Sequence, residues 1–165
     1  MEKLKIVKSK IFTWDELQRR LAIWKFQEKK IVFTNGCFDI LHLGHIELLG
    51  KARELGDILI VGMNSDESVH RIKGPHRPVN SHHARAFALA ALVFVDAVVM
   101  FEEDTPYELI RFIQPDVLVK GKDYEGKEIV GSDVVKAGGG DVVTIELTKG
   151  YSTTHTIEKA HKVHL

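Results

Sequence analysis

Short apolar runs alternate along the chain with segments in which apolar residues recur at helical spacing. The apolar runs predict strands at 31–34, 57–63, 97–101, 117–120 and 141–147. The segments between them predict helices at 43–55, 81–93, 106–113 and 132–137, and a last helix that begins near Ser152. Strands that are apolar throughout indicate a sheet covered on both faces, and alternation with helices indicates parallel βαβ units. The predicted fold class is therefore α/β, a doubly wound sandwich with about five parallel strands.

Residues 1–28 precede this alternation and predict an N-terminal helical appendage to a main domain at 29–165. Thr13 is a suitable N-cap for a helix whose first turn carries two acidic residues. The apolar positions of this helix at helical spacing are Leu17, Leu21 and Trp24. We expect this apolar face to pack on the main domain, with a contact between two copies of the chain as the alternative.

Composition narrows the classes of function. A chain of 165 residues with 44% hydrophobic residues is long enough for one domain with a sizeable core. Lys and Arg together number 23, as do Asp and Glu, so the chain lacks the basic excess typical of proteins that bind nucleic acid. We therefore expect no nucleic-acid partner.

Location follows from the cysteine count and the absence of long apolar runs. The single cysteine, Cys37, excludes an intramolecular disulfide framework and suits a reducing compartment. The lysine-rich N-terminus lacks the apolar stretch of a signal peptide. No apolar run approaches the roughly 20 residues that cross a bilayer. The sequence predicts a cytoplasmic protein without a membrane partner.

The strongest chemical signal follows the first predicted strand, where ligands of doubly wound sheets bind. Residues 34–45 read T-N-G-C-F-D-I-L-H-L-G-H. Gly36 allows the backbone to approach a ligand closely, and His42 and His45 share one face of the helix that begins there. The N-terminus of that helix offers unpaired N–H groups to a phosphate, and two imidazoles beside it suit charge on a phosphoryl group. The alternative is two ordinary polar residues at a helix start.

Other polar residues at strand ends and helix starts support phosphate chemistry independently. Lys120 ends a buried strand, and Lys73 lies in a basic, glycine-containing segment that could fold over a triphosphate. Residues 152–154, Ser-Thr-Thr, open the last helix and either cap it or present its N-terminus to a nucleotide. Asp66 and Asp123 follow predicted strands and could bind substrate hydroxyls or cap short helices.

The string at 34–45 resembles the H-x-G-H signature of the cytidylyltransferase-like nucleotidyltransferases. The resemblance continues through Lys73-Gly74, Arg77-Pro78, Arg85, Asp104-Thr105-Pro106, residues 114–121, Asp123-Tyr124 and residues 150–154. Residues 31–160 together resemble most the branch of this family that adenylylates heptose 1-phosphate in stand-alone form. The family is Rossmann-like, so the resemblance implies that form of the predicted α/β fold.

The resemblance also implies an activity and roles for individual residues. It implies transfer of AMP from ATP to D-glycero-β-D-manno-heptose 1-phosphate by direct attack on the α-phosphate, with Mg²⁺, in ADP-heptose and lipopolysaccharide core synthesis. The catalytic residues that it implies are His42, His45 and Lys73. The nucleotide-binding residues that it implies are Thr34, Asn35, Gly36, Cys37, Phe38, Gly44, Lys120, Ser152, Thr153 and Thr154. The substrate-binding residues that it implies are Asp39, Asp66, Arg85 and Asp123. It assigns no metal ligand to the protein, and it implies a homodimer.

Several alternatives stay open at this point. Within the same class, the acceptor could be glycerol 3-phosphate with CTP, or FMN with ATP. Outside it, the chain could be a nucleotide-binding regulatory module without turnover, or a histidine-rich metal-binding protein. The sequence also departs from the family pattern: His82-His83-Ala84 stands where relatives carry acidic residues, Lys122 stands where they often have glycine, and Leu147 replaces the arginine of glycerol-phosphate cytidylyltransferases.

Overall fold

The computed structural model of the chain describes residues 2–122, 128–146, 148 and 150–162. Its helices and strands run in the order α1 (Lys3–Lys8), β1 (Ile11–Phe12), α2 (Trp14–Phe26), β2 (Ile31–Gly36), α3 (Leu43–Arg53), β3 (Ile58–Asn64), α4 (Asp66–Lys73), α5 (His82–Ala90), β4 (Ala97–Phe101), α6 (Tyr107–Ile113), β5 (Val117–Gly121), α7 (Ser132–Ala137), β6 (Asp141–Ile145) and α8 (Thr153–Lys162). No helix within these ranges is long and apolar enough to cross a membrane.

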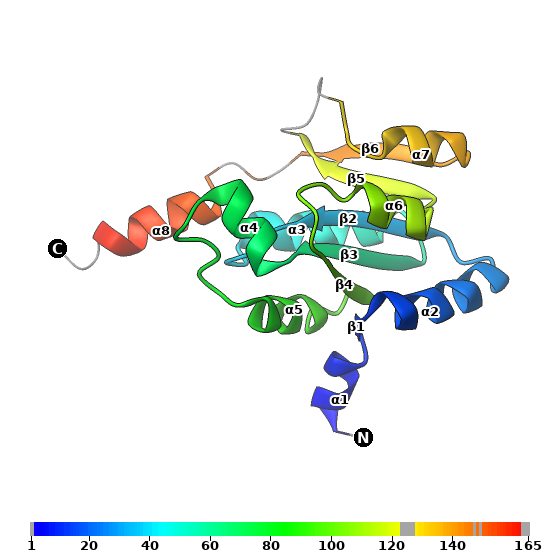
Figure 1. The fold of residues 1–165 in the computed structure, drawn as a ribbon, viewed down its shortest axis with the longest axis horizontal. Helices are drawn as coiled ribbons and strands as arrows, with labels where there is room; N and C mark the ends of the chain where they lie inside the picture. Colours follow the sequence, from blue (N-terminus) through cyan, green and yellow to red (C-terminus); the bar gives the residue numbers. More distant parts are fainter. Residues whose placement is uncertain (1, 123–127, 147, 149, 163–165) are drawn as a thin grey trace.

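The strands form one sheet in the order β1-β4-β3-β2-β5-β6, and every neighbouring pair is parallel (Figure 1). The predicted doubly wound α/β sandwich is therefore confirmed. From β2 the chain moves outward to β3 and β4 on one side, then returns to place β5 and β6 on the other. The strand order reverses between β2 and β5, so the crevice at the carboxyl ends of these two strands is where such a fold binds its ligands.

Helices cover both faces of the sheet, as the continuous apolar strands predict. Alternate residues of each strand point to opposite faces, so Val32 joins one buried cluster and Phe33 the other. Leu49 of α3 and Leu89 of α5 belong to the first cluster, and Leu109 of α6 belongs to the second. The core is thus divided by the sheet into two layers.

The N-terminal segment is built into this core. Thr13 and Glu16 form a reciprocal capping box at the start of α2, with the Glu16 amide 3.3 Å from Thr13 Oγ1. Leu17, Leu21 and Trp24 are buried in the second cluster, so the predicted packing of this helix on the main domain is confirmed. The segment also adds β1 beside β4, a sixth strand that sequence patterning did not predict because it has only two residues.

Helix α4 also differs from what the sequence predicted. The polar sequence of α4 carries too few apolar residues to predict a helix, yet Ser65 caps it by accepting a hydrogen bond from the Ser68 amide at 3.1 Å. Lys73 is therefore the last residue of a helix, and the loop expected around it begins at Gly74.

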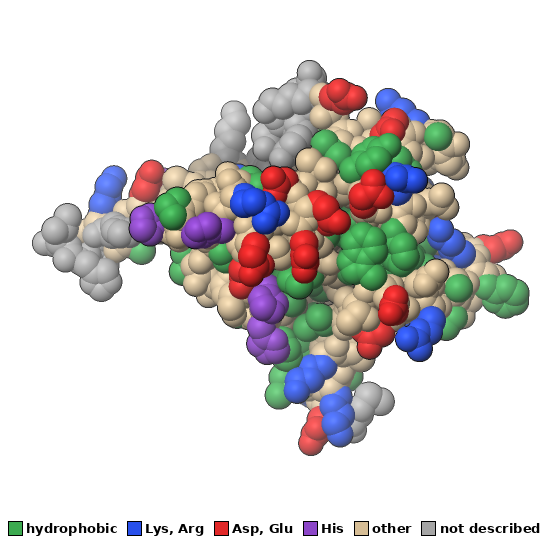
Figure 2. All heavy atoms as spheres, in the orientation of Figure 1, with side chains coloured by type: hydrophobic (Ala, Val, Ile, Leu, Met, Phe, Trp, Pro, Cys, Tyr) green, Lys and Arg blue, Asp and Glu red, His purple; other side chains and the backbone are tan. Residues whose placement is uncertain are grey.

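On the face drawn in Figure 2, acidic and basic side chains are interspersed, in keeping with the equal numbers of the two.

Candidate active site

A cavity of about 530 Å³ opens at the carboxyl ends of β2 and β5. Its lining residues are Asn35, Gly36, Cys37, Phe38, Asp39, His42, Gly44, His45, Leu48, Asn64, Ile72, Lys73, Arg77, Asp104, Thr105, Pro106, Lys120, Glu128, Val130, Tyr151, Ser152, Thr153 and Thr154. Two larger hollows, of about 810 and 740 Å³, lie at the amino ends of the strands and beside β1 and α5. The smaller cavity is the candidate site, because the predicted phosphate-binding groups converge in it.

The histidine pair stands at the start of α3. His42 is the N-cap residue of this helix, and its ring stacks on that of His45 with centroids 3.7 Å apart. The Phe38 ring packs against His45 at 5.3 Å, from a residue whose φ of 46° lies in the left-handed region. Gly44 packs closely against this pair, since a Cβ at its position would lie 3.2 Å from His42 Nδ1. Tight packing thus fixes both imidazoles.

Both imidazoles are neutral at pH 7. Burial and, to a smaller extent, the adjacent His42 lower the pKa of His45 from its ordinary 6.5 to about 4. Burial also lowers the pKa of His42. The Nδ1 atoms of both rings are buried, and within the described part of the chain they have no hydrogen-bond partner. Both residues line the cavity at the N-terminus of α3, a position that suits an anionic ligand.

Two lysines reach the same cavity from opposite sides. Lys120 at the end of β5 is only 7% exposed, and its ammonium group donates a hydrogen bond to the Asn35 side chain at the end of β2. Lys73 comes from the last turn of α4. A triphosphate lying in the cavity would meet positive charge from two directions.

The C-terminal segment forms the remaining wall. Ser152 accepts a hydrogen bond from the His155 amide at 3.1 Å and so caps α8, as the sequence suggested. Thr148 donates to Glu47, and Lys51 donates to the Glu146 carbonyl at 3.5 Å, so this segment is attached to α3. These contacts place a second helix N-terminus opposite that of α3.

The carboxylate of Asp39 is hydrogen-bonded to other groups of the protein. It accepts hydrogen bonds from Arg77 Nε at 2.5 Å and from the amides of Val79 and Asn80 at 2.8 Å. Burial favours the neutral acid, but these hydrogen bonds outweigh it and the pKa of Asp39 is lowered. Asp39 borders the cavity, yet its side chain has no exposed surface.

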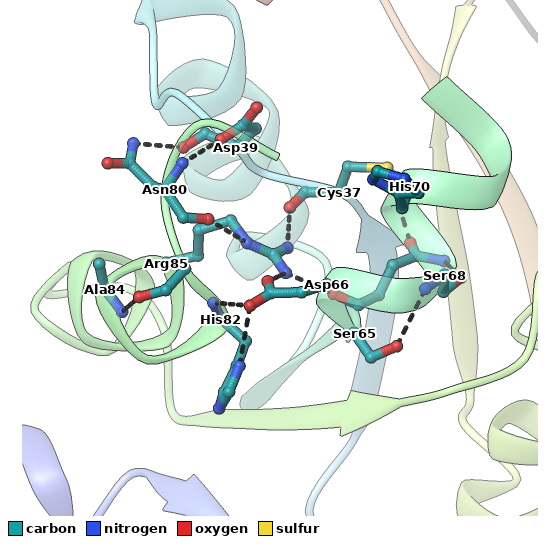
Figure 3. Close-up of polar contacts among 12 residues, drawn as sticks. Cys37, Asp39, Ser65, Asp66, Ser68, His70, Asn80, His82, Ala84 and Arg85 are labelled. Carbon is teal, nitrogen blue, oxygen red and sulfur yellow. Dashed lines mark hydrogen bonds and ion pairs between the residues drawn. The ribbon is translucent and has the colours of Figure 1, made fainter. Parts of the chain in front are cut away.

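Arg85 and Asp66 lie close to Asp39 and Asn80, and neither of them lines the cavity (Figure 3). Arg85 Nη2 is 2.7 Å from Asp66 Oδ1, and the backbone and ring nitrogens of His82 each lie 3.0 Å from Asp66 Oδ2. Burial raises the pKa of Asp66, but these hydrogen bonds prevail and lower it. His82, which stands at a position where the family pattern has acidic residues, therefore contacts the Asp66 carboxylate.

The structure gathers most of the predicted site residues but not all. Neither Asp66 nor Arg85 lines the cavity, so their contact with substrate stays a prediction. Thr34 is buried beneath the cavity. Asp123 and Leu147 lie outside the described residues. Cys37 lines the cavity, and burial raises the pKa of its thiol, which favours the protonated form at neutral pH.

Sequence reasoning did not single out several lining residues. Asn64 ends β3 as Asn35 nearly ends β2, and its position at a carboxyl strand end was the available signal. Glu128 lies in a segment without a strand or helix pattern, and nothing in the sequence marked it. Within the described ranges, no group of three or more His, Cys, Asp or Glu residues is placed to hold a metal ion. His161 and His164 of the tail lie outside what is described of side chains.

The chain is similar to a known protein family and to several known proteins. A family described as cytidylyltransferase-like matches residues 33–159, which include every cavity-lining residue. The bifunctional protein HldE of Wolinella succinogenes is 56% identical over 150 residues, which are 91% of this chain and 31% of that protein. HldE of Nitratiruptor sp. is 61% identical over 131 residues, which are 79% of this chain and 28% of that protein. The chain thus spans less than a third of the length of these relatives.

Solved structures extend the comparison to the fold. A lipopolysaccharide core biosynthesis protein from Thermoplasma volcanium superimposes with a TM-score of 0.60 at 29% identity, over 75% of this chain and 99% of that one. Pantoate-beta-alanine ligase from Francisella tularensis gives a TM-score of 0.56 at 16% identity, over 93% of this chain and 77% of that one. At that identity the second similarity concerns the fold alone.

Proposed function

The chain belongs to the cytidylyltransferase-like family of nucleotidyltransferases, and on that premise we propose that it transfers AMP from ATP to D-glycero-β-D-manno-heptose 1-phosphate. The products are ADP-heptose and pyrophosphate. Identity of 56% and 61% to two bifunctional HldE proteins supports this branch of the family, and the similarity to a lipopolysaccharide core biosynthesis protein supports its pathway.

One observation carries the proposal: the neutral His42–His45 stack shares a cavity with two lysines and a second helix N-terminus. Such a set binds a polyphosphate by charge and by N–H donors, without covalent chemistry. Polar side chains from Asp104, Thr105 and Glu128 line the same cavity and can accept hydrogen bonds from sugar hydroxyls.

The reaction needs positioning more than acid–base catalysis. An oxygen of the sugar phosphate attacks the α-phosphorus of ATP in line, and the bond from that phosphorus to the bridging oxygen breaks to release pyrophosphate. A phosphate monoester dianion is already nucleophilic, so no general base is required. His42 and His45 donate hydrogen bonds to the charge that develops in the transition state, while Lys73 and Lys120 hold the triphosphate.

Magnesium fits this site as a companion of ATP. Mg²⁺ is commonly held by substrate phosphates with one or two carboxylates and retained waters, and the carboxylates of Asp104 and Glu128 line the cavity. Bound to the triphosphate, it would neutralise charge on the leaving pyrophosphate. Homodimer formation and a cytoplasmic location stay predictions from the sequence.

A grid of substrates tests the proposal. Pyrophosphate release is measured with Mg²⁺ and ATP, CTP or GTP, each against heptose 1-phosphate, glycerol 3-phosphate and FMN. We expect turnover with ATP and heptose 1-phosphate. Turnover with CTP and glycerol 3-phosphate, or with ATP and FMN, would keep the mechanism and reject the substrate. ATP binding without turnover in any combination would favour a regulatory module.

A further inference from the structure

Arg85 has a different task from that of a substrate ligand. Its guanidinium donates to the carbonyl oxygens of Cys37 at 2.5 Å and Asn80 at 3.2 Å, and to the Asp66 carboxylate at 2.7 Å (Figure 3). It also donates to the Asn64 carbonyl oxygen at 2.8 Å. Its side chain has no exposed surface. All three nitrogens donate within the protein and the side chain is fully buried, so Arg85 reaches no ligand in this structure.

The partners of Arg85 belong to the segments that carry the proposed reacting groups. Cys37 lies in the loop that leads to the histidine pair. Asp66 opens α4, the helix that ends at Lys73, and Asn80 lies in the loop that leads from α4 to α5. A single buried side chain therefore joins the histidine loop to the segments on both sides of the Lys73 helix.

The contact with Cys37 bears directly on His45. The held carbonyl belongs to the peptide that precedes Phe38, whose left-handed backbone turns its ring onto His45. A Cβ on Gly36 would lie 3.2 Å from the Phe38 ring, so this ring also packs closely against the backbone of Gly36. Release of the Cys37 carbonyl would let this turn, and with it the His45 ring, relax.

Asp39 secures the same junction from the other side. Its carboxylate accepts a hydrogen bond from the Asn80 amide at 2.8 Å, and the Asn80 side chain donates to the Asp39 carbonyl at 2.8 Å. Asn80 is thus held by both Asp39 and Arg85. The residues on either side of Phe38 are consequently tied to the α4–α5 loop.

We propose that Arg85 is a positioning residue for nucleotidyl transfer, which fixes the His42–His45 pair relative to Lys73 without touching either substrate. The reaction in question is the proposed one, so this inference rests on that proposal. Arginine is required because its planar guanidinium offers five N–H donors on three nitrogens. Lysine offers three donors on a single nitrogen at the end of its side chain. Four acceptors from three segments match the guanidinium and exceed the reach of an ammonium group.

The test compares Arg85→Lys with a matched control, Arg53→Lys. Arg53 also joins a carbonyl and a carboxylate, those of Gly56 at 2.5 Å and Asp96 at 3.0 Å, but it ends α3 away from the cavity. We expect Arg85→Lys to lower kcat by roughly 10- to 100-fold, with the KM values for ATP and heptose 1-phosphate within about threefold, because misplacement by about 1 Å can cost that much. The control should keep its kcat.

Two kinetic results would overturn the inference. A raised KM for one substrate with kcat retained would make Arg85 a substrate ligand, as the sequence resemblance implies. A lower melting temperature with both constants retained would make its role purely structural. Should Arg85→Lys not fold, Asp66→Asn weakens one of the four contacts and should lower kcat in the same direction by less.

An NMR titration of His45 tests the inference without turnover. In the wild type burial holds its pKa at about 4. Arg85→Lys should move that pKa upward toward 6.5, because the relaxed Phe38 turn exposes the ring, and Arg53→Lys should not. An unchanged His45 titration in Arg85→Lys would contradict the inference. If the wild type turns over no substrate pair, the proposed function fails, while this titration still decides the positioning role.

Discussion

Two walls of the same cavity are held by opposite means. The histidine wall, formed by residues 37–45 and Arg77, is held by Asp39 and Arg85, whose side chains have no exposed surface. The C-terminal wall, formed by residues 151–154, includes the start of α8, a helix that projects away from the sheet in Figure 1. Tyr151 in that wall is 50% exposed.

The difference suggests that the histidine wall stabilises the transition state and that the C-terminal wall binds the nucleotide. Groups that must meet developing charge gain most from being fixed in advance, because they then need no reorganisation during the reaction. A wall with exposed side chains can adapt to the nucleotide as it binds. Substitutions in the histidine wall should therefore act mainly on kcat, and substitutions in the C-terminal wall mainly on the KM for ATP.

The largest effect is expected from His42→Ala in the histidine wall. Removal of one donor to a transition-state oxyanion typically lowers kcat by about 10²- to 10³-fold. The half-buried ring leaves the core clusters intact, so the melting temperature should change little. Steady-state pyrophosphate release and thermal unfolding measure the two quantities. A variant that keeps near-normal kcat would remove His42 from the mechanism.

Asp39→Asn should break the histidine wall as a structure. The substitution leaves Arg77 without its carboxylate partner and replaces an acceptor of three backbone and side-chain hydrogen bonds with an amide. Loss of one member of a buried ion pair costs on the order of 3 kcal/mol of unfolding free energy. Urea denaturation measures this cost. Asp104→Asn is the control, since the Asp104–Arg71 pair is exposed and should contribute under about 1 kcal/mol.

Acid should weaken the same wall through His45. Because the pKa of His45 is about 4 in the folded protein and 6.5 ordinarily, the unfolded chain binds the proton more readily between these values. Its contribution to stability is complete above pH 6.5, falls as the pH is lowered, and is lost near pH 4. Thermal unfolding of the wild type and His45→Gln across this range measures it. Equal losses of melting temperature in both proteins would exclude His45 as the cause.

The smallest effect is expected from Ser152→Ala in the C-terminal wall. Loss of its hydrogen bond with the His155 amide costs about 1 kcal/mol of helix-cap energy. We expect the KM for ATP to rise about fivefold while kcat stays within about twofold. Thr13→Ala removes the cap of α2, far from the cavity, and should leave the KM unchanged. A loss confined to kcat would contradict the division between the walls.

The sequence predicted what depends on neighbours along the chain. Apolar runs predicted five strands because parallel strands buried on both faces are continuously apolar. The spacing of His42 and His45 predicted their shared face because both belong to one helix start. Strand β1 escaped this reasoning, since its two residues gain their structure only from pairing with Val98 and Val99.

Contacts between distant segments could not be read in this way. Arg85 meets the Cys37 carbonyl across 48 residues, and Asp39 meets the Asn80 amide across 41. A charged residue near a predicted site suggests a contact with a ligand. The sequence alone does not show that an oppositely charged residue of the same protein already pairs with it, as Arg77 pairs with Asp39 and Asp66 with Arg85. The resemblance therefore identified Asp39 and Arg85 as site residues without revealing what they hold.

Phosphorus NMR of the complete reaction tests the central claim most directly. Wild-type protein is incubated with ATP, Mg²⁺ and heptose 1-phosphate, and the phosphorus signals of substrates and products are followed with time. The account predicts that ADP-heptose and pyrophosphate appear in equal amounts, and that His42→Ala forms both at least about 100-fold more slowly. Appearance of ADP and free phosphate, or no product at an ATP concentration that saturates the protein, would contradict it.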